Sequence, residues 1–165
     1  MADFQDAPDV EAIAQRLIPQ YHQHLLNARI RYLFRTGGTF TRGGRVVAGT
    51  AKIIRGETAY LTALNFRIMI DGDLWPKLPA DIQEALVDHE LTHCAGELVD
   101  GQWRWFIKPH DVEDFEPVVA RHGFWTAELK RLNDAAKHYY QTNLLGQMAS
   151  QPTVAPAGQA VGVPA

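Results

Sequence analysis

Residues 79–94 read PADIQEALVDHELTHC, and this stretch predicts the local fold from which the rest follows. A proline opens it and acidic residues follow early, as is typical of a helix N-terminus. Ile82, Leu86 and Leu91 recur at helical spacing and predict the buried side, and Gly96 is the expected stop. We therefore predict an amphipathic helix that packs against a core.

The second half of this helix carries the pattern His-Glu-x-x-His over residues 89–93. One helical turn separates His89 from His93, so both imidazoles can reach the same ion. Glu90 is rotated by about 100° from His89, which places its carboxylate beside the ion rather than on it. Zinc accepts neutral imidazole nitrogens and keeps one position open for water in catalytic sites. The pattern predicts bound Zn²⁺ with Glu90 as the base that activates a metal-bound water, and two surface histidines with a solvated Glu90 are the structural alternative.

A catalytic zinc site needs a third ligand, and His110 is the best candidate. It follows a predicted hairpin in which Asp100-Gly101 is a type I′ turn signal, so the chain can fold back over the metal helix. Glu113 and Glu116 are the main rivals, because a carboxylate is also a good zinc ligand. Four other histidines fit packing or surface positions better: His22, His24, His122 and His138.

The flanking sequence predicts an α+β fold with a small mixed or antiparallel sheet packed on the metal-binding helix. Helical spacing marks residues 9–26 and 125–148, and a short helix ends at Gly123. Strand-like stretches cover residues 30–34, 45–54, 59–70 and 103–107. We expect residues 1–149 to form a single domain. Residues 150–165 hold no charged residue and are rich in proline, glycine and alanine, so a disordered tail is expected there.

Composition excludes several classes of protein. Hydrophobic residues make up 46% of the chain and charged residues 21%, close to the average for globular proteins, which excludes a wholly disordered chain. No apolar run approaches the roughly 20 residues that cross a bilayer, and the acidic start is not a secretory signal. Cys94 is the sole cysteine, which fits a reducing cytoplasm. The net charge of −3 is not that of a generic polyanion binder, so nucleic acid is not favoured as a partner.

The stretch after the predicted turn alternates between aromatic or aliphatic residues and basic ones. Trp103, Trp105 and Ile107 would share one face of a strand, with Arg104 and Lys108 on the other. A basic and aromatic surface could stack single-stranded nucleic acid. A hairpin strand with an apolar inner face is the preferred interpretation, because the overall charge is acidic.

Two segments resemble a known family. LVDHELTHC (residues 86–94) and HDVEDFEPVVARHGFW (residues 110–125) resemble phage metallopeptidases and, more distantly, SprT-like zinc peptidases; the similarity covers about residues 30–125. The resemblance implies a minimal zincin-like domain, Zn²⁺ held by His89, His93 and His110, and Glu90 as general base. It also implies a protein or peptide substrate and, for a phage protein, the host cytoplasm. The residues after His93 do not continue the extended metzincin motif.

Three functions follow from these observations. The favoured one is a zinc peptidase that hydrolyses peptide bonds. The others are a zinc-stabilised binding module without catalysis and a SprT-like protease that acts on DNA-associated proteins. In zincins generally an edge strand pairs with the substrate, and residues 67–70 are the candidate. The oxyanion stabiliser is left open among Arg121, Tyr139 and Tyr140, as are the substrate and the oligomeric state.

Overall fold

The computed structural model describes residues 1–38, 40–42 and 45–149, and it is an α+β protein. The chain forms two compact units, residues 1–110 and residues 111–165. The expectation of one domain over residues 1–149 stays a prediction, and the tail expected at residues 150–165 lies outside the described residues. Within the described part, no helix combines the length and the apolar character needed to cross a bilayer.

A four-stranded sheet forms the centre of the first unit. Its order is β1 (Asp3–Asp6), β2 (Ile30–Thr36), β6 (Phe66–Asp71) and β5 (Gly49–Ile53). β2 and β6 run parallel, whereas β1 and β5 pair antiparallel with their neighbours. β3 (Thr41–Arg42) and β4 (Arg45–Val46) pair with each other in a separate short ladder. The strand expected at residues 30–34 is confirmed, because β2 includes all of these residues.

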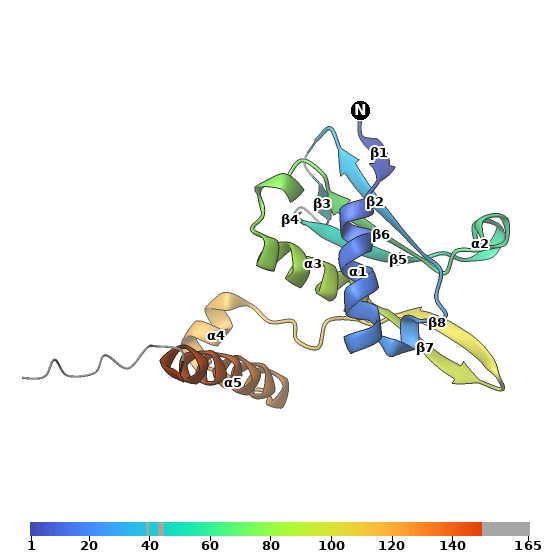
Figure 1. Ribbon diagram of the computed structural model, residues 1–165. Helices are drawn as coiled ribbons and strands as arrows, with labels where there is room; N and C mark the ends of the chain where they lie inside the picture. Colours follow the sequence, from blue (N-terminus) through green and yellow to red (C-terminus); the bar gives the residue numbers. More distant parts are fainter. Residues whose placement is uncertain (39, 43–44, 150–165) are drawn as a thin grey trace, which may run out of the picture. The chain divides into compact units, whose positions relative to one another are not determined.

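Two helices cover one face of this sheet. α1 (Pro8–Tyr21) and α3 (Ala80–His93) lie side by side against it (Figure 1). Alternation along the strands turns one set of side chains toward the helices, and these make up the core with apolar residues of both helices. The core includes Tyr32, Phe34, Phe66, Ile68 and Ile70 from the strands and Val10, Ala14, Leu17, Val87 and Leu91 from the helices.

α3 leads directly into a hairpin. β7 (Cys94–Val99) begins at the residue after the helix and pairs antiparallel with β8 (Gln102–Ile107). Asp100 and Gly101 have φ values of 50° and 77°, as a type I′ turn requires, so the predicted hairpin is confirmed. The amide of Lys108 donates to the carbonyl of His93 (2.8 Å), which returns the chain to the end of α3.

Three sequence expectations are wrong in detail. Residues 59–62, expected to be strand, belong to helix α2 (Gly56–Thr62), where Gly56 leaves the extended region with φ 60°. Gly96 is not a helix stop but a strand residue in contact with the indole of Trp105, which a Cβ there would meet at 2.4 Å. Ile82 is 47% exposed, because the buried residues of α3 lie in its second half.

The second unit is helical in its described part. α4 (Glu116–His122) has Pro117 in its first turn. Gly123 follows its last residue, which confirms the short helix expected to end there. α5 (Ala127–Ala149) is the long C-terminal helix.

A short 3-10 helix in the first unit, η2 (Trp75–Lys77), precedes α3.

Candidate metal centre

Three imidazoles converge at the C-terminal end of α3. His89 and His93 lie one turn apart on the helix, with ring centroids 4.9 Å apart. His110 follows β8, and its ring centroid is 5.1 Å from that of His89 and 4.6 Å from that of His93. Each residue offers a ring nitrogen, and these three atoms all lie within 4.8 Å of one another. The structure therefore brings together the three histidines that the sequence singled out.

The spacing of these nitrogens fits a small tetrahedral cation. Nε2 of His110 is 3.2 Å from Nε2 of His89. Two ligands on a tetrahedral zinc ion, each about 2.0–2.1 Å from the metal, lie about 3.4 Å apart. Imidazole nitrogen is also a donor that zinc accepts readily. The donor set and its spacing therefore suit a zinc ion.

A backbone carbonyl orients His93. The Nδ1 atom of His93 lies 2.7 Å from the carbonyl oxygen of Lys108, so Nδ1–H donates to it. The proton on Nδ1 leaves the Nε2 lone pair available to an ion. The hairpin that returns His110 to the helix thus also fixes the tautomer of His93. No sequence signal marks the carbonyl of Lys108 for this role.

The surroundings of His89 favour its neutral form. Partial burial of the imidazole, followed by the neighbouring His93 and His110, lowers the pKa of His89, although Asp88 acts in the opposite direction. A metal binds neutral imidazole and competes with protons for it. A lowered pKa therefore keeps His89 ready to bind a cation at neutral pH.

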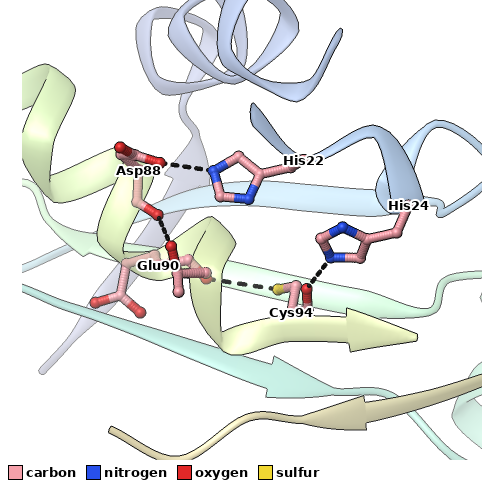
Figure 2. Close-up of polar contacts among 6 residues, drawn as sticks. His22, His24, Asp88, Glu90 and Cys94 are labelled. Carbon is pink, nitrogen blue, oxygen red and sulfur yellow. Dashed lines mark hydrogen bonds and ion pairs between the residues drawn. The ribbon is translucent and has the colours of Figure 1, made fainter. Parts of the chain in front are cut away.

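Glu90 lies buried next to the histidines. It is 4% exposed, and its carboxylate points away from His22 and His24 in Figure 2. A Cβ at Gly49, the first residue of β5, would lie 2.7 Å from Oε1 of Glu90, so the absence of a side chain there makes room for the carboxylate. A buried carboxylate is stable only with hydrogen bonds or positive charge near it, and a divalent cation beside His89 would supply charge.

A second pair of histidines braces the other side of α3 (Figure 2). Nε2 of His22 lies 2.6 Å from Oδ1 of Asp88, and Nε2 of His24 lies 3.0 Å from the carbonyl oxygen of Cys94. His22 is buried, whereas Asp88 is half-buried. These contacts form because α1 ends at Tyr21 and the chain turns into η1 (Gln23–Leu25). The hydrogen-bond partner of the Asp88 carboxylate is therefore His22 rather than one of the candidate metal ligands.

Cys94 is confirmed as a buried small residue. It is fully buried, and its Sγ lies 3.6 Å from the carbonyl oxygen of Glu90. Burial, and to a lesser extent the charge of Glu90, raises the pKa of the Cys94 thiol to about 12. A thiol in this state is neither a nucleophile nor a metal ligand.

The remaining candidates are placed as follows. Glu113 and Glu116, the rival ligands, belong to the second unit, as do Arg121, Tyr139 and Tyr140. Within the second unit, Asp114 accepts a hydrogen bond from the indole nitrogen of Trp125 (2.9 Å).

The expected substrate-binding edge strand was assigned wrongly. Residues 67–70 lie in β6, which is a central strand because β2 and β5 flank it. β5 is the edge strand of the sheet, and its first residue, Gly49, lies next to Glu90. Four of the six residues of β6 are buried apolar residues, as is typical of a strand that is flanked by neighbours.

Comparisons with known proteins place the chain in a family. No curated protein and no solved structure gave a match. A family model does match, over residues 2–137, which is most of the chain, and its description is "Putative phage metallopeptidase". By the extent of that match, and in agreement with the three converging histidines, the chain belongs to this phage metallopeptidase family.

Proposed function

We propose that this protein is a zinc-dependent peptidase in which His89, His93 and His110 hold the metal and Glu90 is the general base. The observation that carries the proposal is the convergence of three imidazole nitrogens within 4.8 Å, with the buried Glu90 following His89 on the same helix. A metallopeptidase family and a group of three histidines suggest a metal ion. We further propose that this metal is zinc and that Glu90 activates a water molecule.

The residues divide the chemical work between them. Bound by the three histidines, zinc would supply Lewis acidity, which polarises a carbonyl group and makes water more acidic. Glu90 takes a proton from the attacking water and delivers it to the nitrogen of the leaving amine. Burial keeps the carboxylate out of bulk solvent, and Gly49 lets it sit close to β5.

The edge strand gives the substrate a place beside this carboxylate. β5 ends the sheet, and an extended peptide can add to such an edge through backbone hydrogen bonds. Because Gly49 begins β5 next to Glu90, a peptide paired along β5 would pass the general base. The proposal therefore favours extended, unfolded segments of protein as substrates.

The substitution Glu90→Gln tests the proposal. It removes the base while keeping the shape of the side chain, so zinc should stay bound while hydrolysis of a quenched fluorescent peptide library falls by about a hundredfold or more. Glu84→Gln is the matched control, because Glu84 lies on the same helix but pairs with Arg16 (3.0 Å) at the surface. It should retain full activity.

Two results would contradict the peptidase. One is a wild-type protein that binds zinc at one equivalent yet cleaves no peptide in the library. The other is a Glu90→Gln variant as active as the wild type. The first would favour a metal that only stabilises a binding module.

A further inference from the structure

Positive charge is concentrated in one part of the sequence. Residues 28–70 hold eight of the 16 basic residues but only one of the 19 acidic residues, Glu57, which gives the segment a net charge of +7. The rest of the chain carries −10. The total of −3 therefore conceals a strongly basic segment, and such asymmetry is typical of proteins that bind polyanions.

The sheet gathers part of this charge into a row. Arg67 on β6 lies directly opposite Arg31 on β2 and directly opposite Lys52 on β5. Phe66 and Ile68, the neighbours of Arg67 in β6, are core residues beneath the helices, so the alternation of the strand turns Arg67 to the other face. Three cations thus cross neighbouring strands on the face opposite α1 and α3.

Two further arginines extend the row where these strands begin or end. Arg29 precedes β2 and Arg55 follows β5, and the pairing of the strands places both at the same end of the sheet. Both are exposed. We call the five residues the basic strip; they are Arg29, Arg31, Lys52, Arg55 and Arg67.

The basic strip is poorly neutralised within the protein. Like charges directly opposite one another across strands destabilise a sheet. Arg31 pairs with Asp6 (2.7 Å), but within the described residues no carboxylate pairs with the other four cations. Arg67 is half-buried, its Nε atom is buried without a hydrogen-bond partner among the described residues, and desolvation lowers its pKa. An external anion would relieve these costs.

The helix that follows Arg55 carries an exposed aromatic residue. α2 follows Arg55 directly and projects beyond the end of the sheet (Figure 1). Tyr60 on this helix is 87% exposed, and helix α2 has no buried residue. Exposed aromatic rings next to cations are the means by which proteins stack the bases of nucleic acids.

We propose that the basic strip binds the phosphate backbone of a nucleic acid. Four of its five cations are arginine, whose planar guanidinium matches the two oxygens of a phosphate better than lysine does. Their arrangement in a flat row across strands suits an extended polyanion more than a single small anion. Glu90 packs against Gly49, which is paired with the core residue Ile70, so the candidate metal centre and the strip lie on opposite faces of the sheet. The protein could therefore hold nucleic acid while its metal centre stays open to a protein substrate.

Fluorescence anisotropy with labelled 30-nucleotide single-stranded and duplex DNA tests the proposal on the full chain. The test variant is Arg31→Gln, Lys52→Gln, Arg67→Gln. The matched control, Lys77→Gln, Arg104→Gln, Lys137→Gln, changes the net charge equally but lies elsewhere. Because removal of each phosphate contact reduces the slope of log K against log salt by about 0.7–0.9, the test variant should lose about two units of slope. We expect its affinity at 0.15 M salt to fall by about tenfold or more, with the control unchanged.

Circular dichroism shows whether the triple variant is folded. Lys52→Gln alone changes an exposed side chain, so it should weaken binding measurably even if the triple variant does not fold. The proposal is overturned if the wild type binds neither DNA at low salt, or if test and control variants lose affinity equally. A third result would also overturn the proposal. In it, the wild type binds vesicles that contain phosphatidylglycerol more tightly than the test variant does, whereas both proteins bind DNA equally.

Discussion

Gly49 is the residue on which the position of the general base most depends. A Cβ at this position would lie 2.7 Å from Oε1 of Glu90 and 2.9 Å from Cδ1 of Ile70. Both atoms belong to buried side chains, so their displacement has a cost.

We therefore predict that Gly49→Ala displaces the Glu90 carboxylate. Peptide hydrolysis should fall by about a hundredfold, since a shift of about 1 Å at a catalytic group has effects of that size. Overpacking should also lower the free energy of unfolding by about 1–3 kcal/mol. Zinc content, measured by mass spectrometry, should stay at one equivalent because no ligand is touched. An active Gly49→Ala enzyme would show that Glu90 is not the base or is not held by this contact.

Cys94 should be inert in the folded protein. Its complete burial, together with a pKa raised to about 12, leaves almost no accessible thiolate at neutral pH. Labelling by iodoacetamide at pH 8 should therefore be at least about a hundredfold slower in buffer than in urea, because it requires opening of the structure. Equal rates under the two conditions would mean that the end of α3 is open in solution.

His22 lies in the turn that follows α1, and its side chain connects this turn to α3. The imidazole is buried and contacts Asp88 at 2.6 Å, immediately before the first candidate ligand. A cavity and a lost hydrogen bond together should make His22→Ala less stable by about 1–3 kcal/mol. His138→Ala is the control, because His138 is exposed on α5. Urea unfolding followed by circular dichroism measures both, and equal midpoints would contradict a bracing role.

Elements with a strong local signal were predictable. The helix at residues 79–94 and the hairpin turn at Asp100-Gly101 depend on local spacing and turn chemistry, and both are present. Residues 59–62 were mistaken for strand, because β-branched and aromatic residues there resemble those of a strand while Gly56 redirects the backbone. The edge strand was also misassigned, because strand order arises from long-range pairing that no local pattern encodes.

The same division holds for the candidate site. His89, Glu90 and His93 share one helix, so helical geometry alone places them. His110 depended on a correctly predicted hairpin. The contacts made by Gly49 and by the carbonyl of Lys108 come from tertiary packing and carry no sequence signal.

For the whole molecule, bound metal should contribute to stability. A ligand that binds only the folded state at a thousand times its Kd adds about 4 kcal/mol. Zinc added to metal-free protein should therefore raise the Tm by about 10 °C or more, whereas His110→Ala should abolish most of this rise. His138→Ala serves as the control and should behave as the wild type does. Identical melting curves with and without zinc would contradict a metal site in the folded chain.

The most direct test is a crystal structure of zinc-loaded protein with anomalous diffraction recorded on both sides of the zinc absorption edge. The predicted result is one anomalous peak about 2.0–2.1 Å from a ring nitrogen of each of His89, His93 and His110, with no fourth protein ligand and with Glu90 adjacent. Absence of a peak among these rings, or a fourth side chain that closes the coordination, would contradict it.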